Sequence, residues 1–228
     1  MSPALYLIPA ALGGDPRSVL PPATVETVRA LRHFAVENAK SARAFLAALD
    51  MPCALRDLKI ETLSEDEAPF LSPLRAGHPL GLISEAGCPG VADPGQRLAA
   101  AAHREGFRVV PLVGPSSILL ALMAAGLEGQ RFAFCGYLPR EAPARAEQIG
   151  ALERRSRQYR ETEIFIETPY RGDVLLAALL EHCAANTRLC VAIDLTLPSE
   201  SVATRSVAQW RAARPAIGRR PAIFLLLA

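Results

Sequence analysis

Residues 82–95 of the chain read Leu82-Ile83-Ser84-Glu85-Ala86-Gly87-Cys88-Pro89-Gly90-Val91-Ala92-Asp93-Pro94-Gly95. Apolar residues 80–83 predict a buried strand and residues 96–105 a helix, so the segment between them is a strand-to-helix loop. Its glycines allow the backbone to approach a ligand closely, and its prolines restrict its shape. Such connections usually take about 2–6 residues, so this longer, rigid loop indicates binding. A purely structural interpretation makes Asp93 the cap of the next helix, with Pro94 at its first position.

The rest of the chain alternates short apolar runs with helical segments. Strands are expected at residues 4–9, 34–37, 80–84, 108–113, 132–137, 163–167, 189–194, 201–207 and 222–227. Helices are expected at residues 25–31, 39–49, 96–105, 116–125, within 139–160 and at 174–183. This alternation predicts the α/β class, with a parallel or mixed sheet covered by helices on both faces. The Gly114-Pro115 break divides the chain into two expected α/β domains, residues 1–114 and 115–228.

Composition sets wide limits on function. The chain has 228 residues, 50% of them hydrophobic, and a net charge of +2, which neither requires nor excludes a nucleic-acid partner. It contains no apolar run of the ~20 residues that a membrane span needs and no signal-peptide pattern, so we expect a cytoplasmic protein. Its five cysteines form no Cys-x-x-Cys pair. They are expected to be reduced thiols, with no metal site.

Three further motifs follow residues 82–95 in order. They are Gly114-Pro115-Ser116-Ser117, then Phe134-Cys135-Gly136-Tyr137-Leu138-Pro139-Arg140, then Glu167-Thr168-Pro169-Tyr170-Arg171. Together the four segments resemble the S-D-A-G-T-P-x-I-S-D-P-G, G-P-S-A, F-x-G-F-L-P-R and E-S-P-x-R signatures of the bacterial rRNA small subunit methyltransferase I group. That group belongs to the tetrapyrrole (corrin/porphyrin) methylase superfamily. The resemblance covers about residues 80–171.

The resemblance implies the tetrapyrrole methylase fold, in which two α/β domains hold S-adenosylmethionine in a cleft between them and the protein is a homodimer. By motif position it assigns these residues to the cofactor: Pro9, Ser84, Glu85, Ala86, Gly87, Gly90, Val91, Ser116, Ser117, Tyr137, Leu138, Glu167 and Thr168. For Ser116, a plain helix cap is the alternative.

A hydroxyl that attacks the methyl group also needs a proton acceptor. Glu37 is the candidate base, because it ends a short strand where the family keeps an acid. A surface or capping carboxylate is the alternative for Glu37, and Asp93 and Glu167 are weaker candidates for the base.

The chain departs from the family pattern on the substrate side. The first loop, residues 9–15, lacks the family's Asn; Asn38-Ala39-Lys40 replaces D-T-R, and Leu197 replaces a Lys. The family's Arg-Gly stands here as Ala203-Thr204, and the sequence ends near its closing strand, where members usually continue. Three functions therefore stay open: a methyltransferase acting on RNA, most plausibly rRNA; one acting on a tetrapyrrole-like small molecule; and an inactive cofactor-binding module.

An arginine cluster lies in the segment after the third motif. Its members are Arg140, Arg145, Arg154, Arg155, Arg157 and Arg160, interleaved with three glutamates. Such a cluster can track phosphates. The interleaved acids favour a solvated helix face with i,i+4 ion pairs.

Overall fold

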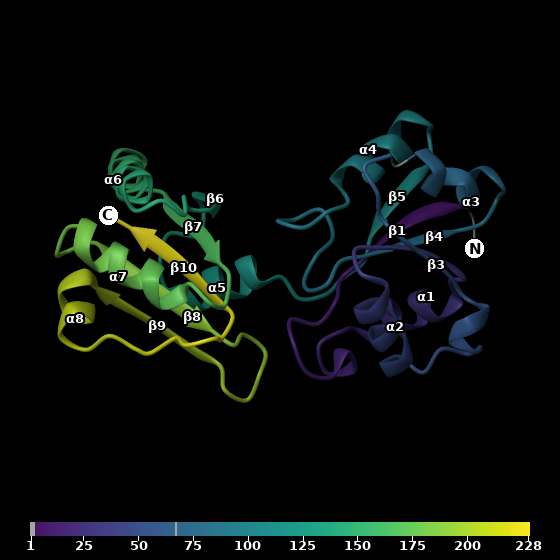
Figure 1. Ribbon diagram of the computed structural model, residues 1–228, viewed down its shortest axis with the longest axis horizontal. Helices are drawn as coiled ribbons and strands as arrows, with labels where there is room; N and C mark the ends of the chain where they lie inside the picture. The colour runs from purple at the N-terminus through teal and green to yellow at the C-terminus, as the bar shows by residue number, and fades with distance from the viewer. Residues whose placement is uncertain (1–2, 67) are drawn as a thin grey trace. The chain divides into compact units, whose positions relative to one another are not determined.

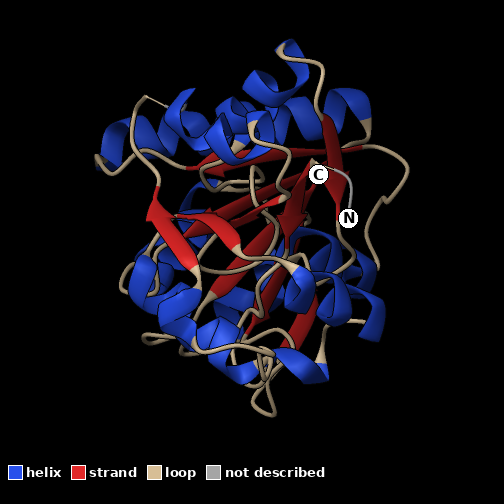
Figure 2. Ribbon diagram, turned by 90° about the vertical axis from the view of Figure 1, so that its right-hand side faces the viewer, coloured by secondary structure: helices blue, strands red, loops and turns tan. Residues whose placement is uncertain are grey.

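The computed structural model describes residues 3–66 and 68–228, and the chain folds as two compact units, Met1–Ser116 and Ser117–Ala228 (Figure 1). Each unit contains its own five-stranded sheet, and helices (blue) lie on both sides of strands (red) in Figure 2. The α/β class expected from the sequence is thereby confirmed. Among the described residues, no helix combines the length and the apolarity needed to cross a membrane.

The first unit has a fully parallel sheet of strand order β3-β2-β4-β1-β5. Its strands are β1 (Ala4–Ile8), β2 (His33–Val36), β3 (Lys59–Thr62), β4 (Leu80–Ile83) and β5 (Arg108–Pro111). The helices are α1 (Pro22–Ala30), α2 (Ala39–Ala48), α3 (Ser72–Arg75) and α4 (Gln96–Arg104). Parallel neighbours need crossover connections, and these helices supply them.

Both faces of this sheet are buried because successive strand residues point to opposite sides. In β1, Tyr6 packs with α1 and α2 residues in one apolar cluster. Its neighbour Leu5 packs with Leu98 and other residues in a second cluster. Central strand β4 is buried along its whole length, as its apolar sequence predicts.

The second unit has a mixed sheet of order β6-β7-β10-β8-β9. Its strands are β6 (Phe132–Tyr137), β7 (Thr162–Glu167), β8 (Arg188–Ile193), β9 (Ser201–Ser206) and β10 (Ala222–Leu227). The helices are α5 (Ser117–Ala125), α6 (Ala142–Tyr159), α7 (Gly172–His182) and α8 (Val207–Ala212). Strand β10 is central, antiparallel to both neighbours and buried throughout.

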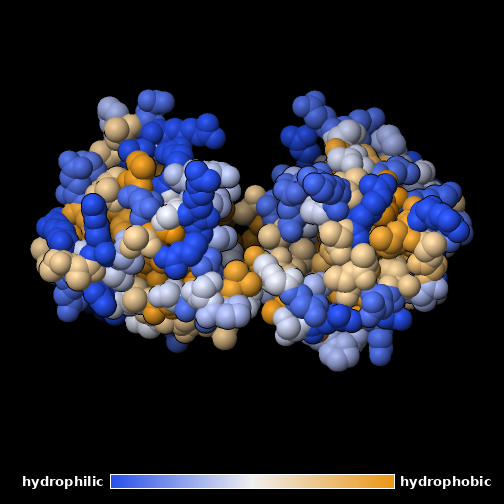
Figure 3. Space-filling view, turned by 60° about the horizontal axis from the view of Figure 1, so that its bottom comes forward, coloured by the Kyte–Doolittle hydropathy of each residue, from blue (hydrophilic) through white to orange (hydrophobic). Residues whose placement is uncertain are grey.

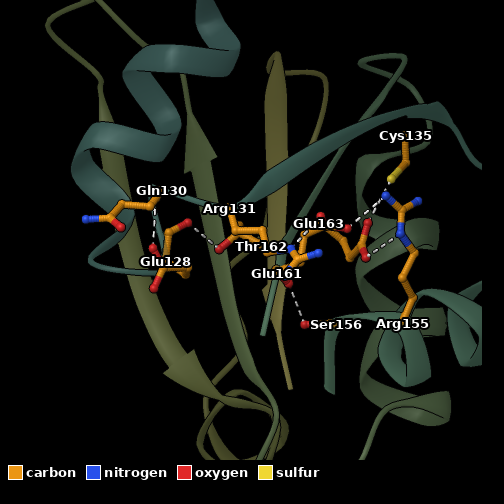
Figure 4. Close-up of polar contacts among 9 residues, drawn as sticks. All are labelled: Glu128, Gln130, Arg131, Cys135, Arg155, Ser156, Glu161, Thr162 and Glu163. Carbon is orange, nitrogen blue, oxygen red and sulfur yellow. Dashed lines mark hydrogen bonds and ion pairs between the residues drawn. The ribbon is translucent and has the colours of Figure 1, made fainter. Parts of the chain in front are cut away.

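A polar cluster around the buried Glu163 connects α6 to the edge of this sheet (Figure 4). The Glu163 side chain is 0% exposed; it accepts a hydrogen bond from the Cys135 thiol at 3.1 Å and pairs with Arg155 at 3.4 Å. Arg155 also pairs with Glu161 at 2.8 Å. Burial raises the pKa of Glu163, and burial together with Glu163 raises the pKa of the Cys135 thiol to about 12. Cys135 is therefore a packed thiol donor rather than a nucleophile.

The arginine cluster is only partly a solvated face. Arg154 and Arg157 are exposed, and Arg157 makes an i,i+4 pair with Glu153 at 4.0 Å. Arg145 and Glu153, in contrast, are buried. Glu153 accepts hydrogen bonds from the Ala184 backbone at 2.7 Å and from the Thr187 hydroxyl, so it joins α6 to the segment after α7. The expected solvated face therefore holds for five of the six arginines, with the buried Arg145 as the exception, and α6 also packs on α7.

Candidate cofactor site

Three strands of the first unit end at the same edge of the sheet. In the parallel register, Ile83 of β4 is paired with Ile8 of β1 on one side and with Val36 of β2 on the other. The residues that follow these ends are therefore neighbours: Pro9, Glu37 and Ser84. Ligands of open α/β sheets bind beyond the carboxyl ends of strands, and this edge is the corresponding place here.

The loop after β4 is joined to the loop after β1 by a small antiparallel bridge. The Ala10 N–H donates to the Gly87 carbonyl at 2.8 Å, and the Gly87 N–H donates to the Ala10 carbonyl at 3.1 Å. Gly87 has φ +70°, a left-handed conformation that favours glycine. A Cβ there would lie 3.5 Å from Leu12 and 4.0 Å from the Pro115 carbonyl.

The same loop also contacts the segment after β5. The Cys88 thiol donates to the Pro115 carbonyl at 3.5 Å. A Cβ on Gly114 would lie only 2.4 Å from the Pro9 side chain, so Pro9 packs directly on this glycine. Gly114 and Pro115, near the end of the first unit, thus lie beside Pro9 and Gly87. Ser117 is the first residue of α5 and opens the second unit.

Strand β2 holds the start of the loop through Glu37. Its Oε2 accepts a hydrogen bond from the Glu85 N–H at 3.0 Å. The Glu85 carboxylate in turn accepts from the Ser41 hydroxyl at 3.2 Å. Asn38 is the N-cap of α2 and accepts from the Lys40 N–H at 2.9 Å. Asn and Asp cap helices about equally well, so the amide of Asn38 meets what an N-cap position requires.

Asp93 lies among acids rather than at a helix start. Burial, then the charges of Glu37 and Glu85, raise its pKa to about 6, against the opposing effect of a hydrogen bond with Ser84. Helix α4 begins at Gln96, and its N-cap is Gly95 with φ +130°. The structural interpretation of Asp93 as that cap is therefore wrong. The loop instead closes on itself, with the Gly90 N–H donating to the Pro94 carbonyl at 3.1 Å.

Two cavities flank this loop. Ser84 and Glu85 line one of about 230 Å³, together with residues of the first loop and of α2. Gly90 and Asp93 line the other, of about 760 Å³. The remaining cofactor candidates of the loop, Ala86, Gly87 and Val91, line neither of them.

The candidates in the second unit lie at one edge of its own sheet. Tyr137 ends β6 and is paired with Ile166 of the parallel strand β7, so Tyr137 and Leu138 lie near Glu167 and Thr168. Glu167 is buried, accepts from the Thr168 N–H at 2.8 Å and pairs with Arg171 at 3.3 Å. This ion pair gives the Glu167–Arg171 motif a clear structural role.

Three residues that fix the loop after β4 were not among the site residues predicted from the sequence. Ala10, Ser41 and Cys88 all make contacts that fix the loop, and none of them stands out by residue type. Their position directly after strand ends, or in the first turn of a helix, is the only signal the sequence offers. Within the described part of the chain, no group of three or more His, Cys, Asp and Glu side chains is placed to hold a metal ion.

The two-unit fold defines the class of the protein. The chain matches the crystal structure of the methyltransferase CobJ with a TM-score of 0.63 and 16% identity, covering 99% of this chain and 94% of that one. It matches a cobalamin biosynthetic enzyme, cobalt precorrin-4 methyltransferase, with a TM-score of 0.62 and 14% identity, covering 98% and 94%. At these identities the likeness shows the fold alone, and that fold is the one of the tetrapyrrole methylases.

Sequence comparison gives the particular family. The ribosomal RNA small subunit methyltransferase I of Mesorhizobium japonicum is 32% identical over 204 residues, which are 90% of this chain and 67% of that relative. The protein of the same name from Xylella fastidiosa is 32% identical over 203 residues, 87% of this chain and 70% of that relative. No family model matches the chain. The chain belongs to the ribosomal RNA small subunit methyltransferase I family, which confirms the resemblance drawn from its motifs.

Proposed function

We propose that this chain is an S-adenosylmethionine-dependent methyltransferase that acts on RNA, in the manner of an rRNA ribose 2′-O-methyltransferase. Curated relatives at about 30% identity are named ribosomal RNA small subunit methyltransferases. The observation that carries the proposal is the convergence of the Pro9 loop, Glu37 and the Ser84–Gly95 loop at one edge of the parallel sheet. A cytoplasmic location and a homodimer belong to the same proposal and rest on family membership.

The residues at this edge fit the proposed cofactor chemically. Gly87 is buried, and a side chain at this position would reach Leu12 and Pro115. Ser84, Glu85 and the glycines of the first loop line a cavity whose polar groups suit an amino acid's ammonium and carboxylate. Ser116 and Ser117 are proposed as cofactor residues by motif position alone. The cofactor, when bound, supplies a methyl group on a positively charged sulfur.

The chain's own residues then position the acceptor and take its proton. We propose Glu37 as the proton acceptor: its Oε2 is engaged by Glu85, while no described residue donates a hydrogen bond to its Oε1. Asp93 is the second acid, and its pKa of about 6 makes it able to exchange protons near neutral pH. Alignment of acceptor oxygen, methyl and sulfur supplies much of the remaining rate enhancement in such reactions.

Calorimetric titration with S-adenosylmethionine and S-adenosylhomocysteine tests the cofactor, and transfer of a radiolabelled methyl group to small-subunit rRNA tests the substrate. We expect micromolar binding of both ligands and labelling of the rRNA. Binding without RNA labelling, followed by labelling of a tetrapyrrole, would favour the small-molecule alternative. Binding with no acceptor in RNA or in metabolite extracts would favour the inactive module.

A further inference from the structure

A second pocket, remote in sequence from the Ser84–Gly95 loop, lies wholly within the second unit. Its volume is about 600 Å³, and it lies between the start of α6, helix α7 and residues 214–216. Apolar residues of α7, including Val174 and Ala178, form part of the lining. The charged and titratable residues of the wall are Arg145, Asp173, Glu181, His182 and Arg214. None of the residues assigned to the cofactor lines it.

Arg145 is a buried cation without an acidic partner. The residue is 8% exposed, and its Nη1 donates to the Arg140 carbonyl at 2.7 Å and to the Pro139 carbonyl at 3.4 Å. Its Nε is buried and has no hydrogen-bond partner. No ion pair joins Arg145 to an acid of the described residues. Buried charges in proteins are normally paired, so we expect the guanidinium of Arg145 to bind an anion.

The two acids of the wall do not supply that anion. The carboxylate oxygens of Asp173 accept the N–H groups of Ile217 and Gly218, each at 2.9 Å. Glu181 has a side chain that is 75% exposed, and its contact is with His182 at 3.9 Å. Neither acid therefore forms an ion pair with Arg145.

The helix start adds to this positive potential. Helix α6 runs over Ala142–Tyr159, and its N-cap, Glu141, makes no side-chain capping hydrogen bond. Ala142 lines the pocket, so the positively polarised start of a long helix lies at its wall. The exposed Arg214 contributes a second guanidinium on the wall. A helix start, a buried arginine and a second arginine together form an anion site with an apolar side.

We infer that this pocket binds a phosphate group carried by a nucleotide, with the phosphate on Arg145 and Arg214 and the base or sugar against the apolar residues of α7. The nucleotide is either a unit of an RNA chain or free in solution. The RNA source rests on the proposed function, since a methyltransferase acting on RNA must hold phosphates away from the reacting atom. The phosphate site itself does not depend on that function.

The test uses the full chain and fluorescence anisotropy of a labelled single-stranded RNA of about ten nucleotides, with UMP and inorganic pyrophosphate as competitors. We expect Arg145→Gln to weaken RNA binding on the order of tenfold, because a charge-assisted hydrogen bond is lost, and Arg214→Ala to weaken it about threefold. The slope of log K against log salt should fall by about 0.7 for each phosphate contact removed. Arg154→Ala is the control, since it removes an exposed positive charge that does not line the pocket, from the same helix as Arg145 and about 13 Å further along. It should change affinity less than twofold.

The outcomes distinguish an RNA chain from a free nucleotide as the source of the phosphate. They also distinguish failure of this inference from failure of the proposed function. Loss of RNA affinity in Arg145→Gln and Arg214→Ala, but not in Arg154→Ala, supports the RNA source. Without RNA binding, direct calorimetric titration with UMP and pyrophosphate replaces the competition, and binding that depends on Arg145 supports a free nucleotide. Equal binding by all variants overturns the inference. Should Arg145→Gln fail to fold, Arg214→Ala decides, because Arg214 is exposed. S-adenosylmethionine affinity is expected to be unchanged in all three variants, so failure of the cofactor proposal is recognised independently.

Discussion

Glu37 accepts a hydrogen bond through its Oε2 from the backbone N–H of Glu85, 3.0 Å away, and so ties the end of β2 to the loop after β4. One carboxylate thus has both a structural contact and a place at the sheet edge where the cofactor is proposed to bind. The two roles separate experimentally, because an amide retains the acceptor oxygen and loses the basicity.

Glu37→Gln is expected to keep S-adenosylmethionine affinity within about threefold and to lose turnover, since the amide oxygen still accepts from Glu85. Glu37→Ala should lose both, because the loop start is released. Calorimetry and radiolabelled methyl transfer measure the two quantities. Undiminished turnover in Glu37→Gln would remove Glu37 as the base.

Gly87→Val is expected to weaken S-adenosylmethionine binding strongly, because the side chain would enter the space beside Leu12 and Pro115. The backbone there is left-handed, so the variant should also lose about 1–2 kcal/mol of stability. Gly77→Val is the matched control: Gly77 has φ +83° with no atom near its Cβ position. Both variants should lose similar stability in thermal unfolding, and only Gly87→Val should lose cofactor affinity. Equal cofactor affinity in the two variants would contradict the placement of the site.

Gly114→Ala is expected to displace the Pro9 loop, because its Cβ would lie 2.4 Å and 2.8 Å from Pro9 atoms and 2.9 Å from Leu20. Overpacking of this kind costs about 1–3 kcal/mol. Gly129→Ala, where no atom lies within 4 Å, is the control. Urea unfolding of both variants measures the difference, and a Gly114→Ala protein as stable as the control would show that Pro9 moves without cost.

Asp93 should make stability depend on pH in a defined direction. Its pKa is raised from 3.8 to about 6 in the folded chain, so the folded state binds the proton more tightly than the unfolded state. The contribution of this group to the free energy of unfolding is therefore largest below pH 3.8, falls as pH rises, and is fully lost above about pH 6.

Asp93→Asn removes this dependence. Relative to the variant, the wild type should lose about 1 kcal/mol between pH 4 and pH 7, after allowance for solvent screening of a partly exposed carboxyl. This corresponds to a difference in melting temperature of about 3 °C. Parallel melting curves of the two proteins at all pH values would show that Asp93 titrates normally.

The exposed apolar residues give fewer testable predictions than the buried groups. Met123 and Tyr170 are among the exposed large apolar side chains. On the face that Figure 3 shows, hydrophobic residues (orange) lie among hydrophilic ones (blue). Isolated exposed apolar residues are common in proteins and carry no functional argument by themselves. The testable features are therefore those in which a buried or strained group has a specific neighbour.

The sequence by itself determined the elements whose signal is local. Strand β4 is predicted by its continuous apolar run, and β10 by a run buried on both faces. The order of the four motifs determined the family. Strand β3, in contrast, was not among the expected strands, because it is an edge strand whose exposed residues Lys59–Thr62 show no apolar pattern. Helices α3 and α8 were also missed, since four and six residues are too few to establish a helical period.

Only the tertiary structure decided which residues act together. The strand order β3-β2-β4-β1-β5 brings Pro9, Glu37 and Ser84 to one edge, although they are 28 to 75 residues apart in the chain. The tertiary structure also places Asp93 near other acids instead of at the predicted helix cap. In the second unit it buries Arg145, although the sequence of α6 is largely polar. The physical reason is that the period of a segment reports its local conformation, whereas pKa, burial and ligand contacts depend on neighbours brought close by strand pairing and packing.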